Sequence, residues 1–151
     1  MAKESLSELH LAVWRAFLKA HATVVDQIDH DLAAEQRLSL SSYDVLIELY
    51  EAPDRRLRMH ELAKRVVLSR SGLTRLVDRL EAEGLLTRDR CGTDRRGAYA
   101  VITEQGIAAL RKAWPVYARG ISQYFARWFT QEEAQIFVAA LERLLQASPY
   151  E

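Results

Sequence analysis

The residues best suited to chemistry in this sequence lie on one polar helix face between residues 70 and 83. Apolar residues recur there at positions i, i+3, i+4 and i+7, which predicts an amphipathic helix with a buried apolar stripe. The opposite face carries hydroxyl and guanidinium groups, which suit phosphate oxygens and the edges of bases. Its members are Arg70, Ser71, Thr74, Arg75, Asp78 and Arg79. The alternative is an ordinary solvated face, because nearly every amphipathic helix has one.

A second group of charged side chains lies in the loop Gly92–Gly97, between two short segments of alternating hydrophobicity. Such a pattern predicts a β-hairpin. The adjacent Arg95 and Arg96 repel each other unless an anion accepts them, and the narrow minor groove of DNA attracts inserted arginine. Asp94 can pair with Arg96 and hold it extended. An ordinary charged turn is the alternative interpretation.

The charge of the chain is balanced in total but segregated along its length. The 151 residues include 21 basic and 21 acidic side chains. Residues 1–54 carry four Lys and Arg against ten Asp and Glu, residues 55–96 carry twelve against six, and residues 97–151 carry five of each. The segment with the polar helix face and the hairpin therefore has a net charge of +6. This pattern is typical of a surface that binds phosphates.

Helices are expected before and within this basic segment. Apolar residues at steps of three and four predict a long first helix from about Ser5 to Ala34. Ser41 is expected to cap a second helix, which ends before Pro53. A short helix over 59–66 and a tight connection then precede the polar helix. This succession predicts a helix-turn-helix.

Two further helices are expected after the hairpin. Thr103 is a suitable N-cap for the first of them, and Pro115 predicts a kink near Ala113. The run from Thr130 to Glu133 matches a capping box and opens a last helix. The apolar residues of this last helix are expected to face inward, and they are Ile136, Phe137, Ala140, Leu141, Leu144 and Leu145.

The composition argues against several classes of protein. No apolar stretch approaches the roughly 20 residues that a bilayer crossing needs, and Met1–Ser7 lacks the pattern of a signal peptide. We therefore expect a soluble cytoplasmic protein that does not bind membranes. No nucleotide-binding or nucleophile motif is found, and the four histidines are too dispersed for a metal site. We accordingly expect no enzyme activity, no cofactor and no metal.

Two stretches of sequence together resemble a known family. The first is LAKR at 62–65 with SRSGLTRLVDRLEAEGLL at 69–86, and the second is DRRG at 94–97 with VITEQG at 101–106. They resemble the MarR (multiple antibiotic resistance regulator) family of winged helix-turn-helix transcriptional regulators. The resemblance implies a mainly α fold in which a helix-turn-helix and a two-stranded wing are joined to long N- and C-terminal helices that form a dimerisation region.

This resemblance also implies an organisation and a function. The chain would form one regulator domain, with a DNA-binding lobe at 37–103 and dimerisation helices at 1–36 and 104–151. It would act as a ligand-responsive repressor, a homodimer on a pseudo-palindromic operator in double-stranded DNA. The residues implied in the major groove are Ser69, Arg70, Ser71, Thr74 and Arg75, with Asp94 and Arg96 in the wing. Arg79 extends the same helix face, and Arg95 fits as a second wing contact.

A dimer is also expected on physical grounds, because one helix and one wing offer little surface for selective DNA binding. The alternative functions are a winged helix used only for protein interaction or dimerisation, and the dimerisation module of an enzyme. Apolar residues at both ends of the chain either join two subunits or cover the chain's own core. They are Leu6, Leu9, Val13, Phe137, Leu141, Leu144 and Leu145.

The resemblance further implies a small aromatic or phenolic effector, bound between the dimer helices and the DNA-binding lobe. Arg15 is a candidate to pair with a carboxylate, and Trp14 to stack on a ring. The alternatives are a surface ion pair for Arg15 and a core position for Trp14. His10 and Tyr43 are further candidate walls of such a pocket. Cys91 is a candidate for oxidation or, alternatively, a partly buried structural residue.

Overall fold

Helices make up most of the chain, and one small sheet interrupts them. The computed structural model describes residues 6–66, 70–90 and 97–148. Within these residues the three strands form an antiparallel sheet with the order β1-β3-β2. In chain order the elements are α1 (Glu8–Gln36), α2 (Leu40–Glu51), η1 (Pro53–Arg55), β1 (Arg56–Arg58), α3 (Met59–Arg65), α4 (Arg70–Ala82), β2 (Leu86–Asp89), β3 (Tyr99–Ile102), α5 (Glu104–Tyr124), η2 (Ala126–Trp128) and α6 (Gln131–Gln146).

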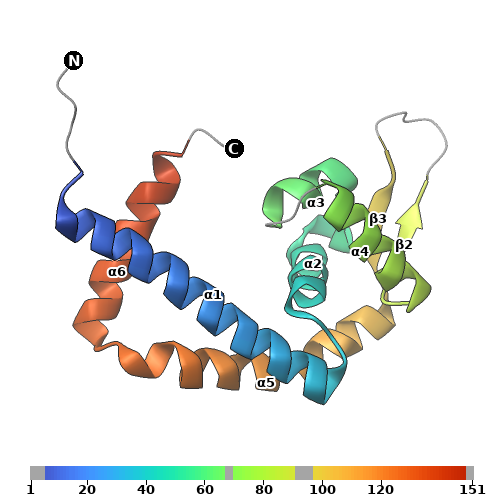
Figure 1. Cartoon of the computed structure of the whole chain (residues 1–151). Helices are drawn as coiled ribbons and strands as arrows, with labels where there is room; N and C mark the ends of the chain where they lie inside the picture. Colours follow the sequence, from blue (N-terminus) through green and yellow to red (C-terminus); the bar gives the residue numbers. More distant parts are fainter. Residues whose placement is uncertain (1–5, 67–69, 91–96, 149–151) are drawn as a thin grey trace.

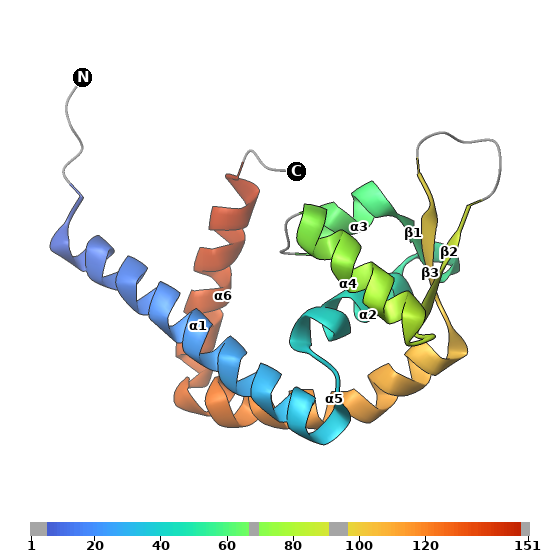
Figure 2. The same cartoon turned by 45° about the vertical axis from the view of Figure 1, so that its right-hand side comes forward.

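The elements form two regions, which Figures 1 and 2 show from two directions. The winged lobe, within residues 37–103, contains α2, α3, α4 and the sheet. The helical region, within residues 6–36 and 104–148, contains α1, α5 and α6. α1 packs alongside α5, and α5 also contacts α2. The fold is thus mainly helical with a small winged sheet, as the sequence predicts.

The winged lobe has an apolar core beneath the helix-turn-helix. Its helices bury the stripes that the sequence predicts, and Leu32 of α1 completes the same core. Strand β1 also contributes, because Leu57 is buried and pairs with Ala100 of β3. The sequence did not predict β1, since three residues are too few to show an alternating pattern. The largest fully buried side chains are Leu32, Val45, Leu46, Leu49, Leu62, Val77, Leu80 and Leu86.

The start of α2 differs from the prediction that Ser41 is its cap. Ser39 is the N-cap, and its Oγ accepts a hydrogen bond from the Ser42 N–H at 3.0 Å. Asp29 of α1 accepts another from the Leu40 N–H at 2.7 Å. Because these two acceptors satisfy free N–H groups of the first turn, the helix begins earlier than its sequence alone suggests.

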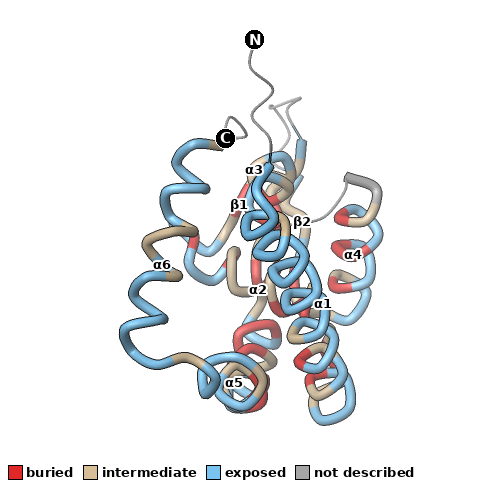
Figure 3. Tube along the Cα trace, turned by 60° about the vertical axis from the view of Figure 1, so that its left-hand side comes forward, coloured by how far each residue is buried: buried red, intermediate tan, exposed pale blue. Residues whose placement is uncertain are grey.

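The helical region leaves its apolar faces exposed. Figure 3 shows α1 and α6 as mostly exposed, whereas the helices of the winged lobe have buried stripes. Leu9 of α1 is 73 % exposed and Ile136 of α6 is 71 % exposed. No residue of α6 is fully buried. The prediction that its apolar residues face inward is wrong for Ile136, Leu144 and Leu145, which are exposed, whereas the other three are half-buried. The chain covers this face only in part: the centroid of the Phe137 ring lies 5.5 Å from that of Phe129, whereas Leu144 and Leu145 lie outside the buried core of the described residues and stay exposed.

One helix, α5, joins the two regions. Thr103 caps it as predicted, accepting a hydrogen bond from the Gly106 N–H at 3.0 Å. Ile107, near its start, is buried in the core of the winged lobe, and the helix also packs against α1. α5 continues through Pro115 without a break, and its axis bends in Figures 1 and 2. A kink centred near Ala113 stays a prediction.

Candidate nucleic-acid interface and ligand cavity

The second helix of the helix-turn-helix, α4, has the two faces that the sequence predicts. Its apolar stripe is buried against the lobe, and a hydroxyl and two guanidinium groups are exposed on the other side. The buried members are Leu73, Leu76, Val77 and Leu80, and the exposed members are Thr74, Arg75, Asp78 and Arg79. The Thr74 hydroxyl and the Arg75 and Arg79 guanidinium groups can donate hydrogen bonds to phosphates and base edges.

Part of the predicted interface is not described by the structure. Arg70 and Ser71 lie in the first turn of α4, but only their backbone is described. Their contacts, like those of the hairpin tip, stay predictions. Outside the described residues fall Ser69, Asp94, Arg95, Arg96 and Cys91.

The end of α4 is fixed by a glycine in the left-handed region. Gly84 has a φ of +76°, which costs glycine little and strains other residues. Its N–H donates to the Glu81 carbonyl oxygen at 3.0 Å, and the Leu85 N–H donates to the Leu80 carbonyl oxygen at 2.9 Å. These two bonds form a Schellman motif. The predicted stop is confirmed, and it directs the chain from α4 into β2.

The start of α5 is anchored to the same turn. The Thr103 hydroxyl donates to the Gly84 carbonyl oxygen at 2.6 Å, and the Thr103 N–H donates to the Leu85 carbonyl oxygen at 3.1 Å. A Cβ on Gly106 would lie 2.1 Å from the Leu85 carbonyl oxygen, so a side chain there would force the two segments apart. The Thr-x-x-Gly sequence thus holds the strand that returns from the hairpin against the end of α4.

A largely buried arginine joins α4 to the hairpin. Only 13 % of the Arg88 side chain is exposed, and its guanidinium lies 2.6 Å from Asp78 Oδ1 and 3.2 Å from Glu81 Oε1. Glu81 also accepts a hydrogen bond from the Arg88 backbone N–H at 2.8 Å. Asp78 therefore belongs to the polar face of α4 and also helps to attach β2 to that helix. The spacing of Asp78 and Glu81, three residues apart on one helix face, was the signal that could have indicated this pairing.

Two further arginines lie at the outer edge of the sheet. The guanidinium carbon of Arg56 lies 3.9 Å from the centroid of the Tyr99 ring, and that of Arg58 lies 4.8 Å from it. Arg56 also pairs with Asp89 at 3.5 Å. Cation–π contacts of this kind restrain arginine side chains without neutralising them. Because both residues belong to the unpredicted β1, their position beside the hairpin could not be predicted either.

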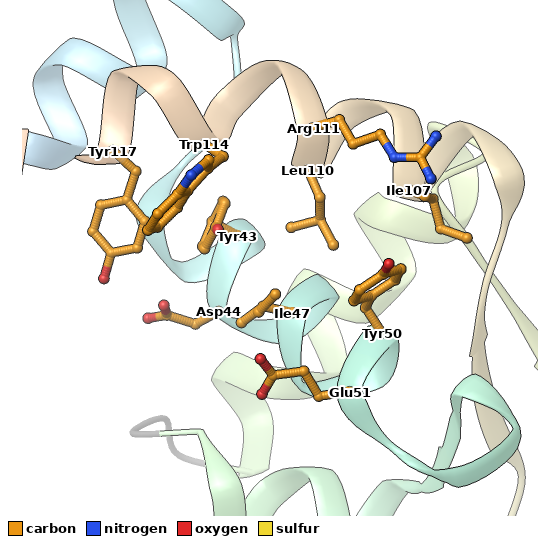
Figure 4. Close-up of a pocket in the computed structure, with 10 residues that line it drawn as sticks. All are labelled: Tyr43, Asp44, Ile47, Tyr50, Glu51, Ile107, Leu110, Arg111, Trp114 and Tyr117. Atoms are coloured by element: carbon orange, nitrogen blue, oxygen red, sulfur yellow. The ribbon is translucent and has the colours of Figure 1, made fainter. Parts of the chain in front are cut away.

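A cavity of about 540 Å³ lies between α2 and α5, as Figure 4 shows. It is close to the junction of the two regions, where the resemblance places an effector. Tyr43, one of the predicted effector residues, is in its wall. The lining residues are Tyr43, Asp44, Ile47, Tyr50, Glu51, Ile107, Leu110, Arg111, Trp114 and Tyr117. The sequence predicts which of these residues share a helix face, but it does not predict the space between two helices.

The other predicted effector residues lie on α1, which does not contribute to this cavity. His10, Trp14 and Arg15 are all exposed. Trp14 is 55 % exposed, so its alternative interpretation as a core residue is wrong for the single chain. Its ring stacks on Phe17 with 6.4 Å between centroids. Contacts of these three residues with an effector stay predictions.

One of the two carboxyl groups in the cavity wall, that of Asp44, has a raised pKa. Burial, and secondarily repulsion by Glu48, raises the pKa of Asp44 to about 6. Burial also raises the pKa of Tyr43 and of Tyr117. A partly desolvated carboxylate favours a partner that replaces its lost hydration. The cavity therefore combines aromatic and aliphatic walls with charged groups, among them a partly desolvated carboxylate that a ligand can satisfy.

Among residues 6–66, 70–90 and 97–148, no group of three or more His, Cys, Asp and Glu side chains is placed to hold a metal ion. Within the same ranges, no helix combines the length and apolar character needed to span a bilayer.

Comparison with known proteins identifies relatives over most of the chain. A family model described as MarR family matches residues 38–97. The HTH-type transcriptional repressor YetL of Bacillus subtilis is 31 % identical over 113 residues, which cover 75 % of this chain and 67 % of YetL. The family-model match includes the helix-turn-helix and β2 and ends before β3.

Solved structures share the architecture as well. Sco3205, a MarR family transcriptional regulator from Streptomyces coelicolor crystallised in complex with DNA, is 33 % identical with a TM-score of 0.83, covering 93 % of this chain and 91 % of Sco3205. AbsC, a MarR family regulator from the same organism, is 28 % identical with a TM-score of 0.84, covering 95 % of this chain and 97 % of AbsC. With its helix-turn-helix, its wing strands and its flanking helices matched along nearly their full length, the chain belongs to the MarR family of transcriptional regulators.

Proposed function

We propose that this protein is a ligand-responsive repressor that binds operator DNA as a homodimer. In this proposal α4 enters the major groove and the hairpin tip, with Asp94, Arg95 and Arg96, reaches the adjacent minor groove. The observation that carries it is the exposed face of α4, where Arg75 and Arg79 are presented on a helix that is fixed to the wing strand. The DNA complex of Sco3205, at 33 % identity, supports the same role for this chain.

The fixed geometry of the winged lobe supports simultaneous contact by helix and wing. Arg88 joins α4 to β2, and the Thr103–Gly84 hydrogen bond joins the returning strand to the end of α4. A preorganised pair of elements loses little conformational entropy when it binds. The helix and the hairpin would therefore meet neighbouring grooves of one duplex as a single unit.

The homodimer would account for the exposed apolar faces of the helical region. An apolar groove of about 470 Å³ runs between α1 and the segment from α5 to α6, with Phe17 and Phe137 in its walls. Leu9 and Leu145 extend the exposed apolar surface on α1 and α6, at 73 % and 68 % exposure. Exposed apolar patches of this kind are typical of subunit interfaces. A two-fold axis would let the same surfaces of two copies cover each other.

The effector would act at the junction of the two regions. A small aromatic molecule between α2 and α5 would contact the winged lobe through Tyr43 and the long connecting helix through Trp114. Its binding would favour one angle between these helices over another. A coupling free energy of about 1–3 kcal/mol is enough to change DNA occupancy about 5- to 150-fold.

Fluorescence anisotropy with DNA fragments from upstream of the protein's own gene tests the proposal. We expect operator fragments to bind at least about a thousandfold more tightly than shuffled ones, with an affinity that falls steeply between about 50 and 200 mM salt. Sedimentation velocity should show two protein chains on each operator. Equal binding of operator and shuffled fragments, or no binding at low salt, would refute the proposal.

A further inference from the structure

The residues that line the cavity between α2 and α5 favour a ligand of one sign of charge. We propose that it binds an organic cation, an amine or quaternary ammonium group carried on an aromatic or aliphatic body. The proposal gives the ligand class of the effector site and in that respect rests on the proposed function. Binding of the cation itself can be measured without DNA.

Three aromatic rings meet at steep angles at one end of the cavity. The ring centroids of Tyr43 and Tyr117 are 4.8 Å apart with planes at 71°, and those of Trp114 and Tyr117 are 6.1 Å apart with planes at 88°. All three residues line the same cavity (Figure 4). Rings attract ammonium and guanidinium groups through the negative charge of their faces, and aromatic cages for quaternary ammonium ions use this effect. Rings in different planes can surround such a group on more than one side.

A fourth ring in the wall already carries a cation. The guanidinium carbon of Arg55 lies 5.0 Å from the centroid of the Tyr50 ring. One face of the Tyr50 ring is therefore already in contact with a positive charge. The three rings at the other end are packed with one another and are the ones we assign to a ligand.

The charged groups of the wall are negative on balance. Asp44 and Glu51 contribute carboxylates, and Arg111 contributes one guanidinium. Figure 4 shows the Asp44 carboxylate at the end where Trp114 and Tyr117 lie, with the Arg111 guanidinium at the opposite end. A charged ligand head among the rings would therefore lie beside a carboxylate. This placement favours a cation and opposes an anion.

The desolvation of Asp44 strengthens this preference. Burial raises the pKa of Asp44 to about 6, so the group is mainly ionised near pH 7.5 although it is poorly hydrated. A cation beside it would replace the missing hydration by direct attraction. A carboxylate or phenolate at the same place would add a second negative charge beside Asp44. Because the site is partly dehydrated, the free energy of binding such an anion would be less favourable.

Isothermal titration calorimetry of the full chain near pH 7.5, without DNA, tests the charge preference. The probes are benzyltrimethylammonium, benzyl alcohol and benzoate, which share a phenyl ring and differ in charge. We expect the cation to bind at least about tenfold more tightly than either of the others, as cation–π and ionic attraction add to the same apolar contact. Benzoate binding as tightly as the cation, or no binding of any probe, overturns the proposal.

The variant Asp44→Asn keeps the shape of the side chain and removes its charge. We expect the dissociation constant of benzyltrimethylammonium to rise about tenfold, while that of benzyl alcohol stays the same. Asp26→Asn is the matched control, because Asp26 is an exposed carboxylate on α1 that does not line this cavity. Unchanged cation affinity in Asp44→Asn overturns the proposal.

A pH titration of the unaltered protein gives a second test, which does not depend on a variant that folds. A cation favours the ionised form of Asp44, so its affinity must fall as Asp44 is protonated. With a pKa of about 6, the loss should be about tenfold between pH 7.5 and 5. The other titratable and charged groups around the cavity are Tyr43, Glu48, Tyr50 and Glu51 from α2, and Arg111 and Tyr117 from α5. An unchanged affinity over this range contradicts the proposal.

Measuring DNA binding separately distinguishes this proposal from the proposed function. Loss of operator binding on addition of benzyltrimethylammonium, seen in the unaltered protein and much reduced in Asp44→Asn, supports both. A protein that binds the cation in calorimetry and binds no operator supports the cation site and refutes the proposed function. A protein that binds operator and shows no preference for the cation refutes the site alone.

Discussion

The winged lobe and the helical region use amphipathic helices of the same kind with opposite results. Leu80 of α4 is fully buried by its own chain, whereas Leu144 of α6 is 61 % exposed. The apolar residues are spaced with equal regularity in both helices. Periodicity thus identifies the apolar face of a helix but does not tell which polypeptide covers it. Among the described residues, the exposed apolar helix faces lie mainly in the helical region, on α1 and α6. Such faces are typical of one side of a subunit interface.

Leu80→Ala tests the winged lobe, where the chain buries its own apolar helix face. Removing a fully buried leucine side chain should lower the free energy of unfolding by about 2–5 kcal/mol. Urea denaturation followed by circular dichroism measures the loss. The matched variant Leu144→Ala should cost far less at protein concentrations where subunits are dissociated. Equal losses for the two variants under those conditions would contradict the contrast between the regions.

Leu144→Glu tests the other side, because it introduces a charge into the proposed subunit interface. We expect monomers in sedimentation velocity and a loss of operator affinity of about a hundredfold, since two half-sites are no longer bound by one particle. Gln135→Glu is the control. It adds the same charge nine positions away on α6 (Gln131–Gln146), which is the opposite face of the helix. Dimers that persist in Leu144→Glu would exclude this face as the interface.

Arg75→Ala addresses the exposed face of the winged lobe. Loss of a guanidinium that contacts a base edge should reduce discrimination between operator and mismatched DNA by about 1–3 kcal/mol. Lys64→Ala, which removes an exposed charge from α3, should instead weaken binding to all sequences alike. Anisotropy titrations with operators altered at single base pairs separate the two effects. A variant that keeps the full discrimination would show that Arg75 does not contact a base edge.

Arg88→Met should have the smallest effect of the four, because Asp78 is 59 % exposed and water compensates much of the lost ion pairing. We expect a severalfold loss of DNA affinity, or about 1 kcal/mol, with no change in the dimer. Hydrogen exchange in β2 and β3 should become faster, since β2 loses the side-chain ion pairs that attach it to α4. Arg90→Met removes an exposed charge two residues away and is expected to leave exchange unchanged. Equal exchange in both variants would show that Arg88 contributes little to holding the hairpin.

Much of the winged lobe could be predicted because its local signals agree with its packing. The stripe of α4, the left-handed Gly84 and the Thr103 cap each follow from a few neighbouring residues. The cap of α2 could not be predicted in this way. Ser39 and Ser41 are both good caps, and the choice is helped by Asp29, which approaches from α1. Contacts between distant segments decide what local preferences leave open.

The candidate site shows the same division. The exposure of Thr74 and Arg75 follows from the helical period of 3.6 residues once the buried stripe is known. The role of Arg88 depends on how a strand packs on a helix, and the ligand cavity depends on the space between α2 and α5. Neither is a property of one segment. Sequence patterns therefore predicted the exposed face of α4 better than the cavity between α2 and α5.

The ion pairs that Arg88 of β2 makes with Asp78 and Glu81 of α4 limit how ligand binding can change DNA binding. With β2 fastened to α4, a rearrangement elsewhere in the molecule moves both as one rigid body. In the proposed dimer, the two copies would then change their separation and tilt against the helical repeat of the duplex, while each copy keeps its preference for the same bases. Ligand-bound and ligand-free proteins would recognise identical half-sites and differ in the distance between half-sites that they tolerate.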